Sequence, residues 1–124
     1  MNNEMKKVAI FGANGSIGRA LCRHYQKQSH VYAFSRNDFD IDETSLDKIL
    51  LSDYEEETLS KIASTFENDS FNTIIISIGM LHSHDFLPEK RIEDFSSEQF
   101  LETIRVNTLI PTLIAKSFHK KLKN

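Results

Sequence analysis

The stretch that decides the fold reads Val8-Ala-Ile-Phe-Gly-Ala-Asn-Gly-Ser-Ile-Gly-Arg-Ala-Leu21. Four apolar residues lead straight into a loop with glycines at positions 12, 15 and 18, and an apolar-periodic segment follows the loop. The chain has only 4 glycines, so three of them in one turn concentrate backbone freedom where something must approach closely. The stretch therefore predicts a buried strand, a tight loop and a helix N-terminus, in that order.

The rest of the chain alternates between strand and helix patterns. Apolar-rich stretches predict strands over residues 7–11, 31–34, 46–51 and 71–78, and the run from Val8 to Phe11 is typical of a strand covered by helices on both faces. Apolar residues at helical spacing predict helices over residues 16–28, 54–67 and 96–121. Because the connections are too long for hairpins, this order predicts a single α/β domain over residues 1–124, with a parallel sheet and right-handed crossovers.

Polar residues mark the expected helix starts. We expect Ser52 or Asp53 to cap the second helix, and Ser96 or Ser97 to cap the third. The first helix is expected to turn one face toward the sheet. That face would comprise Ile17, Ala20, Leu21, His24 and Tyr25.

Each glycine of the loop has a separate expected role. Gly12 permits the tight turn, Gly15 lets the backbone approach a pyrophosphate, and Gly18 lets the helix pack closely on the strand. Free N–H groups at the helix N-terminus then point at the phosphates. The spacing is GxxGxxG rather than GxGxxG, and the lysine that a P-loop requires is missing from the motif. The loop predicts a dinucleotide site, with a bare structural turn as the alternative.

The residue just past the second strand is expected to determine which of the two nicotinamide dinucleotides, NAD or NADP, is bound. An acidic side chain there would bind the ribose 2′-hydroxyl and repel a 2′-phosphate, but this chain has Ser35 and Arg36. The planar guanidinium suits phosphate, so NADP is favoured over NAD. A plain surface arginine is the alternative, and the nearby Asp38 and Asp40 argue against NADP. Arg19 is expected to add a second cation near the phosphate or to be solvated.

Composition narrows the class of partner. The formal net charge is -3, which gives no global attraction to nucleic acid or to an anionic membrane. No apolar run approaches the roughly 20 residues that span a bilayer, and we expect a cytoplasmic protein. The single Cys22 excludes an internal disulfide and is expected to be an unreactive helix residue.

Two further clusters are assigned no function. His82, His84 and Asp85 have no second cluster that would complete four metal ligands, so no metal site is expected. Positive residues crowd the end of the last helix, where they complement the helix dipole, and a nucleic-acid patch is the less favoured reading. These residues are Lys116, His119, Lys120, Lys121 and Lys123.

The chain resembles a short-chain dehydrogenase/reductase of the C-factor-like (C-signal) branch. The matching motifs are Gly12-Ala-Asn-Gly-Ser-Ile-Gly18, Ser77-Ile-Gly79, Gly79-Met-Leu-His82, Pro88-Glu-Lys90 and Arg105-Val-Asn-Thr108. Serine stands at position 77 where the family has the asparagine of its Asn-Ala-Gly motif. The resemblance implies a Rossmann-like three-layer fold with strand order 3-2-1-4, an NADP cofactor, and hydride transfer to a carbonyl in the full-length form.

Motif and resemblance together define the expected site. The cofactor-binding residues are Gly12, Asn14, Gly15, Ser16, Ile17, Gly18, Ser35, Arg36, Asp53, Ser77 and Gly79. By resemblance, Asn107 matches the asparagine of the family's Asn-Ser-Tyr-Lys catalytic set. Pro111 cannot donate the helical hydrogen bond to the Asn107 carbonyl, which leaves that oxygen able to hold a water. A kinked helix without catalytic function is the alternative.

The remaining catalytic residues are not in this sequence. Tyr25, Tyr32 and Tyr54 all lack a lysine four residues later, and no tyrosine follows Gly79. The resemblance therefore implies the NADP-binding part of an oxidoreductase, cut short after the fourth strand and its helix. The alternatives are a non-catalytic, self-associating nucleotide-binding module and a degenerate protein that binds nothing.

A second copy is the expected protein partner. The fourth strand would lie at an edge of the sheet without a covering strand. We expect another copy to cover either that edge or the apolar face of the last helix. That face comprises Phe100, Ile104, Leu109 and Leu113.

Overall fold

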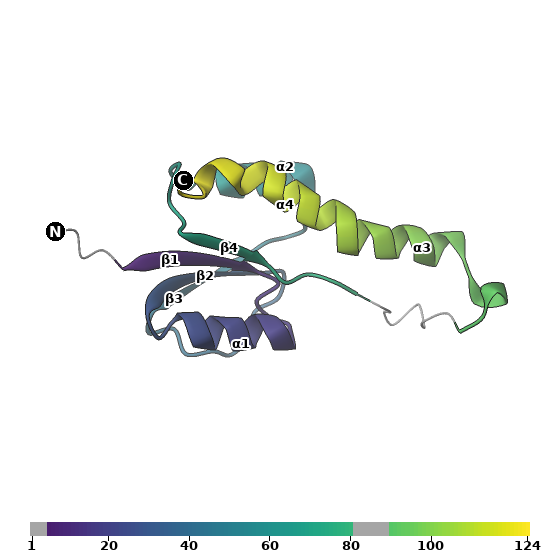
Figure 1. Ribbon diagram of the computed structural model, residues 1–124, viewed down its shortest axis with the longest axis horizontal. Coiled ribbons are helices and arrows are strands. Elements are labelled where there is room, and N and C mark those ends of the chain that lie inside the picture. The colour runs from purple at the N-terminus through teal and green to yellow at the C-terminus, as the bar shows by residue number, and fades with distance from the viewer. Residues whose placement is uncertain (1–4, 81–89) are drawn as a thin grey trace.

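A single parallel sheet forms the centre of the computed structural model, which describes residues 5–80 and 90–124. Its strands are β1 (Lys6–Phe11), β2 (Ser29–Ser35), β3 (Leu46–Leu50) and β4 (Thr73–Ile76). They lie in the order β3-β2-β1-β4, and every pairing is parallel, which confirms the expected Rossmann-like arrangement (Figure 1).

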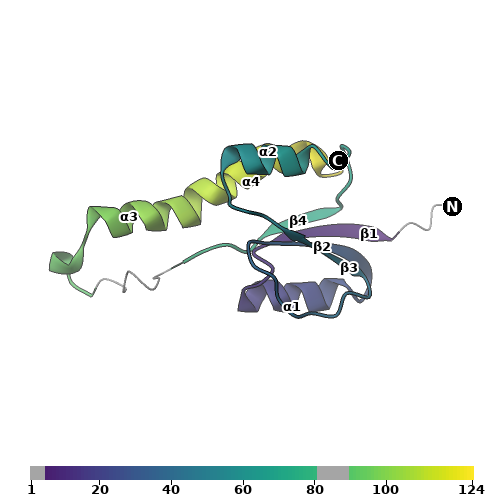
Figure 2. The ribbon, with the colours of Figure 1, turned by 180° about the vertical axis from the view of Figure 1, so that it is seen from behind.

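Helices cover both faces of this sheet. Helix α1 (Ser16–Tyr25) lies on one face, whereas α2 (Glu56–Ala63) and α4 (Ile110–Phe118) lie side by side on the other (Figures 1 and 2). Each strand therefore has apolar residues pointing both ways, which explains the unbroken apolar run of β1 from Val8 to Phe11.

The two cores differ in composition. On the α2 and α4 face, the Phe11 and Phe34 rings stack with centroids 4.2 Å apart, and Phe118 packs edge-on against Phe11 at 4.9 Å. On the α1 face, the core is mainly aliphatic, and Tyr25 packs against it. Its buried residues include Val8, Ile10, Val31, Ala33 and Leu46, together with Cys22 and Phe39. Neighbouring residues of β1 thus alternate between the two cores.

The buried face of α1 differs from the expected one. Gly18 and Cys22 are its buried residues, and Ile17 is 68% exposed. The prediction therefore placed the middle of the buried face on the wrong residues. Gly18 makes the closest contact of the helix, but it has no side chain, so a search for regularly spaced apolar side chains does not count it. The helix also ends at Tyr25, three residues before the predicted end.

The start of α2 also differs from the expectation. Its N-cap is Glu55, which makes no side-chain capping bond, so the predicted cap at Ser52 or Asp53 is wrong. Asp53 acts earlier: its Oδ1 accepts a hydrogen bond from the Glu55 N–H at 2.9 Å and so orders the turn that leads into the helix.

The predicted last helix is divided into several segments. Helix α3 (Ser97–Ile104) passes into a π-helical turn, η2 (Arg105–Leu109), and then into α4. Short 3-10 turns, η1 (Ile92–Asp94) and η3 (His119–Lys121), flank these helices. Ser96 caps α3 as expected, since its Oγ accepts from the Gln99 N–H at 3.1 Å. Pro111 lies at the start of α4, just past the wide turn, which accommodates a residue that cannot donate an N–H.

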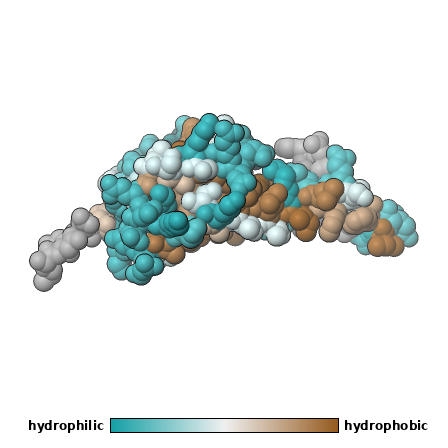
Figure 3. All heavy atoms as spheres, turned by 90° about the horizontal axis from the view of Figure 1, so that it is seen from above, coloured by the Kyte–Doolittle hydropathy of each residue, from teal (hydrophilic) through white to brown (hydrophobic). Residues whose placement is uncertain are grey.

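Helix α3 extends past the carboxyl ends of the strands and carries apolar residues on its surface (Figures 1 and 3). Phe100 is 48% exposed and Ile104 43%, and Leu109, at the end of η2, is 49% exposed. Leu113 packs against the core instead, so it does not belong to this exposed face. Within residues 5–80 and 90–124, no helix is both long and apolar enough to cross a membrane.

The C-terminal residues return to the start of β4. The Phe71 N–H donates to the Lys121 carbonyl at 2.8 Å, and the Lys123 N–H donates back to the Phe71 carbonyl at 2.8 Å. On the other side, the Asn72 N–H donates to the Lys7 carbonyl at 2.9 Å. This clamp fixes the residues that lead into β4 between β1 and the C-terminal segment.

Candidate functional site

A cavity of about 640 Å³ opens at the carboxyl ends of the strands, where ligands of open α/β sheets bind. It is bounded by the glycine loop, by the ends of β2 and β4, by the segment after β3 and by the α3–η2 region. Most of the predicted cofactor-binding residues line it. They are Gly12, Asn14, Gly15, Ser35, Arg36, Asp53, Ser77 and Gly79. The other three, Ser16, Ile17 and Gly18, form the first turn of α1 and are not part of the lining.

Two of the loop glycines are required by the packing of the protein itself. Gly12 has φ +83, and a Cβ there would lie 2.3 Å from the Ser77 carbonyl oxygen. A Cβ on Gly18 would lie 2.1 Å from the Gly12 carbonyl oxygen. These contacts hold the loop against the end of β4 and hold α1 against the loop.

Gly15 is different. It is the N-cap of α1 with φ -70 and ψ 165, a conformation open to any residue, and it makes no side-chain capping bond. A Cβ there would meet only the Gly12 carbonyl oxygen, at an ordinary contact distance of 3.6 Å. The protein therefore has room for a side chain at the one loop position where the cavity and the N-terminal amides of α1 meet.

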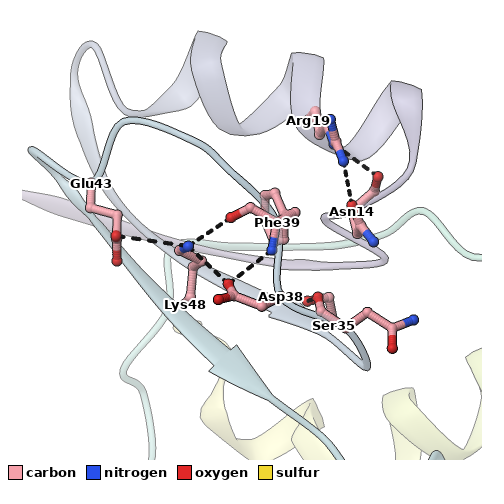
Figure 4. Close-up of polar contacts among 8 residues, drawn as sticks. Asn14, Arg19, Ser35, Asp38, Phe39, Glu43 and Lys48 are labelled. Carbon is pink, nitrogen blue, oxygen red and sulfur yellow. Dashed lines mark hydrogen bonds and ion pairs between the residues drawn. The ribbon is translucent and has the colours of Figure 1, made fainter.

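Arg19 joins the glycine loop to the loop that follows β2. Its Nε donates to the Asn14 carbonyl at 3.0 Å and its Nη2 to Asn14 Oδ1 at 2.6 Å (Figure 4). The same guanidinium lies 5.6 Å from the centroid of the Phe39 ring. Arg19 is therefore engaged in holding two loops together, and it does not line the cavity.

Arg36 is exposed and lines the cavity at the end of β2. Its guanidinium carbon lies 5.9 Å from the centroid of the Tyr54 ring. Within the described residues this guanidinium makes no hydrogen bond and no ion pair. Burial raises the pKa of Tyr54, so its phenol stays neutral beside the arginine. The neighbouring Ser35 is almost fully buried, and its hydroxyl donates to the Asn37 carbonyl at 2.7 Å.

The acidic residues near Arg36 have partners of their own. Asp38 Oδ1 accepts from Lys48 Nζ at 2.9 Å and from the Phe39 N–H at 2.8 Å (Figure 4). The Lys48 hydrogen bond and the Phe39 amide hold the pKa of Asp38 below its usual range. Asp40 also acts on Lys48, and neither aspartate lines the cavity.

An ion pair between α3 and η2 lines the cavity. Arg105 donates to both carboxylate oxygens of Glu102, at 2.9 and 2.8 Å, and this bond lowers the pKa of Glu102. Asp53 is satisfied by Thr58 and by the Glu55 amide, which lower its pKa. Of the two arginines that line the cavity, Arg105 forms an ion pair with Glu102, whereas Arg36 forms none among the described residues and acts on the Glu102 carboxylate only at longer range, lowering its pKa.

Asn107 reaches the segment after β4. Its Oδ1 accepts from the Met80 N–H at 2.6 Å, and its Nδ2 donates to the Met80 carbonyl at 2.7 Å. A Cβ on Gly79 would lie 3.2 Å from the same Oδ1, which explains why the strand end carries a glycine. Asn107 therefore fixes the backbone that follows β4.

Sequence reasoning missed several residues of the cavity. Tyr54, Glu102 and Arg105 line it but were not expected there. Glu102 and Arg105 have opposite charges at an i, i+3 spacing, which predicts a helix-surface pair but not its place at the cavity. His82, His84 and Asp85 lie outside the described residues, as do Leu81 and Pro88.

The chain was compared with family models, with curated proteins and with solved structures, and only the solved structures gave matches. No family model matches the chain, and no curated protein matches it. Among solved structures, an NADP-bound short-chain dehydrogenase/reductase from Burkholderia multivorans matches with a TM-score of 0.81 at 16% identity, covering 96% of this chain and 55% of that one. A short-chain dehydrogenase family protein from Francisella tularensis gives a TM-score of 0.77 at 18% identity, covering 97% and 48%.

A further match is an NAD+-bound short-chain dehydrogenase from Leptospira borgpetersenii, with a TM-score of 0.76 at 21% identity, covering 94% of this chain and 46% of that one. The chain thus spans about half the length of the structures it matches. At these identities the likeness concerns the fold. With strand order β3-β2-β1-β4 and helices on both faces, this chain has the Rossmann-like fold of the short-chain dehydrogenase structures.

Proposed function

We propose that this chain is the NADP-binding part of a cytoplasmic short-chain dehydrogenase/reductase. The cofactor's pyrophosphate would lie over Gly15 and the N-terminal amides of α1, and its adenosine would extend toward Arg36 and Asp53. When bound, the nicotinamide would supply the hydride or accept it. The residues described here would hold and orient the cofactor.

Gly15 carries this proposal. Gly12 and Gly18 are explained by contacts inside the protein, but Gly15 has open space around it and an uncapped helix N-terminus beside it. A group that approaches from the cavity accounts for both features, because phosphate binds free N–H groups at helix N-termini. The residues present therefore fit a dinucleotide.

Arg36 supports NADP over NAD. Its guanidinium makes no hydrogen bond and no ion pair among the described residues, and Asp38 and Asp40, which would oppose a 2′-phosphate, do not line the cavity. Both cofactors occur among the matched structures, so this preference rests on the side chains of the present chain.

The oxidoreductase assignment extends to Asn107. We assign it a place in the family's catalytic set, acting through a backbone carbonyl that Pro111 cannot bond in helical register. Its side chain is already engaged with Met80, which leaves the carbonyl as the group able to hold a water. Hydride transfer to a carbonyl substrate is assigned to a form that also carries a Tyr-x-x-x-Lys pair.

A second copy of the chain is the proposed protein partner. Phe100, Ile104 and Leu109 expose apolar area on the segment that extends past the sheet. Burial of apolar area is the main favourable contribution to association. A non-catalytic module that binds the dinucleotide and associates through this face is the alternative function, and it rests on the same exposed residues.

Calorimetric titration of the purified chain with NADP+ and with NAD+ tests the proposal. We expect measurable binding of both and tighter binding of NADP+. In Gly15→Asn, a favourable N-cap residue would fill the open space at Gly15 and accept hydrogen bonds from the N-terminal amides of α1. Affinity for both cofactors should therefore fall about tenfold or more while the fold persists. Ser60→Asn, on the exposed face of α2, is the matched control and should bind normally.

Two results would overturn the proposal. Absence of heat with either cofactor, from a chain shown to be folded by circular dichroism, would exclude nucleotide binding. Equal affinity of the wild type and Gly15→Asn would place the dinucleotide elsewhere.

A further inference from the structure

An acidic residue, Asp38, lies close in sequence to Arg36. Asp38 lies two residues after Arg36 on the loop that leaves β2. A carboxylate at the ribose would repel a 2′-phosphate and favour NAD. The direction in which the Asp38 carboxylate points would therefore affect the choice of cofactor alongside the charge of Arg36.

Lys48 engages Asp38 from the neighbouring strand. It lies in the middle of β3, two residues after the buried Leu46 and on the same face of the sheet. Its Nζ donates to Asp38 Oδ1 at 2.9 Å and to the Phe39 carbonyl at 2.6 Å, and it lies 3.8 Å from Glu43 Oε2 (Figure 4). The Lys48 side chain is only 17% exposed, so its ammonium is fixed at this point rather than free in solvent.

Phe39 anchors the same loop independently. It is 6% exposed, and both Arg19 and Lys48 approach its ring at 5.6 Å. Because Phe39 is buried among apolar residues of the α1 face, the path of the loop does not depend on the Asp38 ion pair alone. Removing the Asp38–Lys48 ion pair is therefore expected to move the Asp38 carboxylate and leave its charge unpaired, and to change the fold much less.

We propose that Lys48 is a positioning residue for cofactor selectivity: it holds the Asp38 carboxylate against β3, outside the cavity, so that the Asp38 charge does not oppose a 2′-phosphate at Arg36. The inference rests on the proposed NADP binding and adds a residue to it. Lys48 would not touch the cofactor. It acts through Asp38. The two residues are distant in sequence and come together only when β2 and β3 pair, so the sequence alone does not reveal their contact.

The test is a double-mutant cycle read as the ratio of NADP+ to NAD+ affinity, because the ratio cancels any general loss of folded protein. Lys48→Met should lower this ratio roughly two- to five-fold, the size expected for one charge interaction at the surface, because the Asp38 side chain is 71% exposed although that of Lys48 is not. Asp38→Asn should change it much less, because the aspartate is already held away. The double variant should return to the wild-type ratio.

Two further measurements separate positioning from a purely structural role. Lys48→Arg keeps a cation at the same place and should restore the ratio. The effect of Lys48→Met should shrink as salt rises above about 0.15 M, because exposed charges are screened beyond about 8 Å. A general defect in the loop would weaken both cofactors alike and would not depend on salt in this way.

The outcomes distinguish this inference from the function beneath it. If Lys48→Met lowers the ratio and Asp38→Asn raises it by the same factor, Lys48 acts by its own charge and the positioning role is overturned. If the ratio in Lys48→Met is unchanged while the wild type prefers NADP+, this inference alone fails. If the wild type shows no preference for NADP+, the inference and the proposed NADP selectivity fail together.

Discussion

The Arg36 guanidinium carbon lies 5.9 Å from the centroid of the Tyr54 ring, which joins the loop after β2 to the segment after β3. An arginine over an aromatic face keeps its charge and retains N–H donors at the edge of its plane. The side chain is thus held before any ligand arrives, and less conformational entropy remains to be lost on binding.

Replacing this arginine should separate the two cofactors. In Arg36→Met, NADP+ affinity should fall about tenfold or more, because a charge-assisted hydrogen bond contributes about 1.5–3 kcal/mol. NAD+ affinity should change little. Arg36→Lys, which keeps the charge but loses the planar fork, should lie between. The measurement is calorimetry with both cofactors, and an equal loss for both would contradict the assigned role.

The glycines of the loop should differ sharply in their tolerance of alanine. Gly18→Ala should lower the free energy of unfolding by about 2 kcal/mol, because overpacking outweighs the roughly 1 kcal/mol gain in helix propensity. Gly12→Ala should cost at least as much, since its positive φ adds backbone strain. Gly15→Ala should cost only about 0.5 kcal/mol. Urea unfolding of the three variants checks the order, and equal losses would contradict it.

The thiol of Cys22 should be protected from labelling reagents, and its ionisation should lower the free energy of unfolding at high pH. Burial raises the pKa of its thiol to about 11, from an ordinary value of 9.0. Between these values the unfolded chain releases the thiol proton and the folded chain keeps it, so stability should fall as pH rises above 9. Urea midpoints from pH 8 to 10 should show this slope, and Cys22→Ala should lack it. Thiol labelling at pH 8 should follow global unfolding, and fast labelling of the folded protein would contradict the burial.

Asn107 should control the order of the residues after β4. Asn107→Leu removes both bonds to Met80, so the Met80 amide should exchange hydrogen about ten times faster, as expected for the loss of roughly 1.4 kcal/mol. Asn107→Asp keeps an acceptor for that amide and should be intermediate. Native-state exchange followed by NMR gives the answer, and unchanged protection in Asn107→Leu would show that the segment is held by other contacts.

Self-association should depend on the exposed face of α3. Sedimentation velocity of the wild type is expected to show a dimer or larger species. Phe100→Lys combined with Ile104→Lys should give a monomer, because charge cannot be buried there without a partner. Thr112→Lys, at an exposed position on α4, is the matched control. A wild type that stays monomeric at high concentration would contradict the proposed interface.

Local patterns were sufficient for the sheet. The apolar runs around Val8, Val31, Leu46 and Ile74 predicted four strands correctly to within three residues at each end, since burial on both faces leaves a direct record in composition. The glycine loop was placed correctly for the same reason: close approach restricts residue type. The face of α1 was wrong because its closest contact is made by Gly18, which has no side chain.

The polar part of the site was only partly predictable. Arg36 could be placed because it directly follows a strand. Lys48 and Asp38 are ten residues apart, and their pairing exists only once β2 and β3 have aligned. Glu102 and Arg105 form a recognisable helix pair, but their position at the cavity depends on the π-helical turn, which periodicity does not reveal.

The clamp around Phe71 sets an order of assembly. The N–H and carbonyl of Phe71 are both taken by the C-terminal segment, about fifty positions later in the chain. During synthesis, the first three strands and α1 can form their contacts while the C-terminal segment is still inside the ribosome. The hydrogen bonds that hold Phe71, just before β4, cannot form until that segment has emerged. Contacts between distant positions form slowly because a long loop must close first. We therefore expect β4 to be the last strand to join the sheet, and the edge of β1 to stay open until it does.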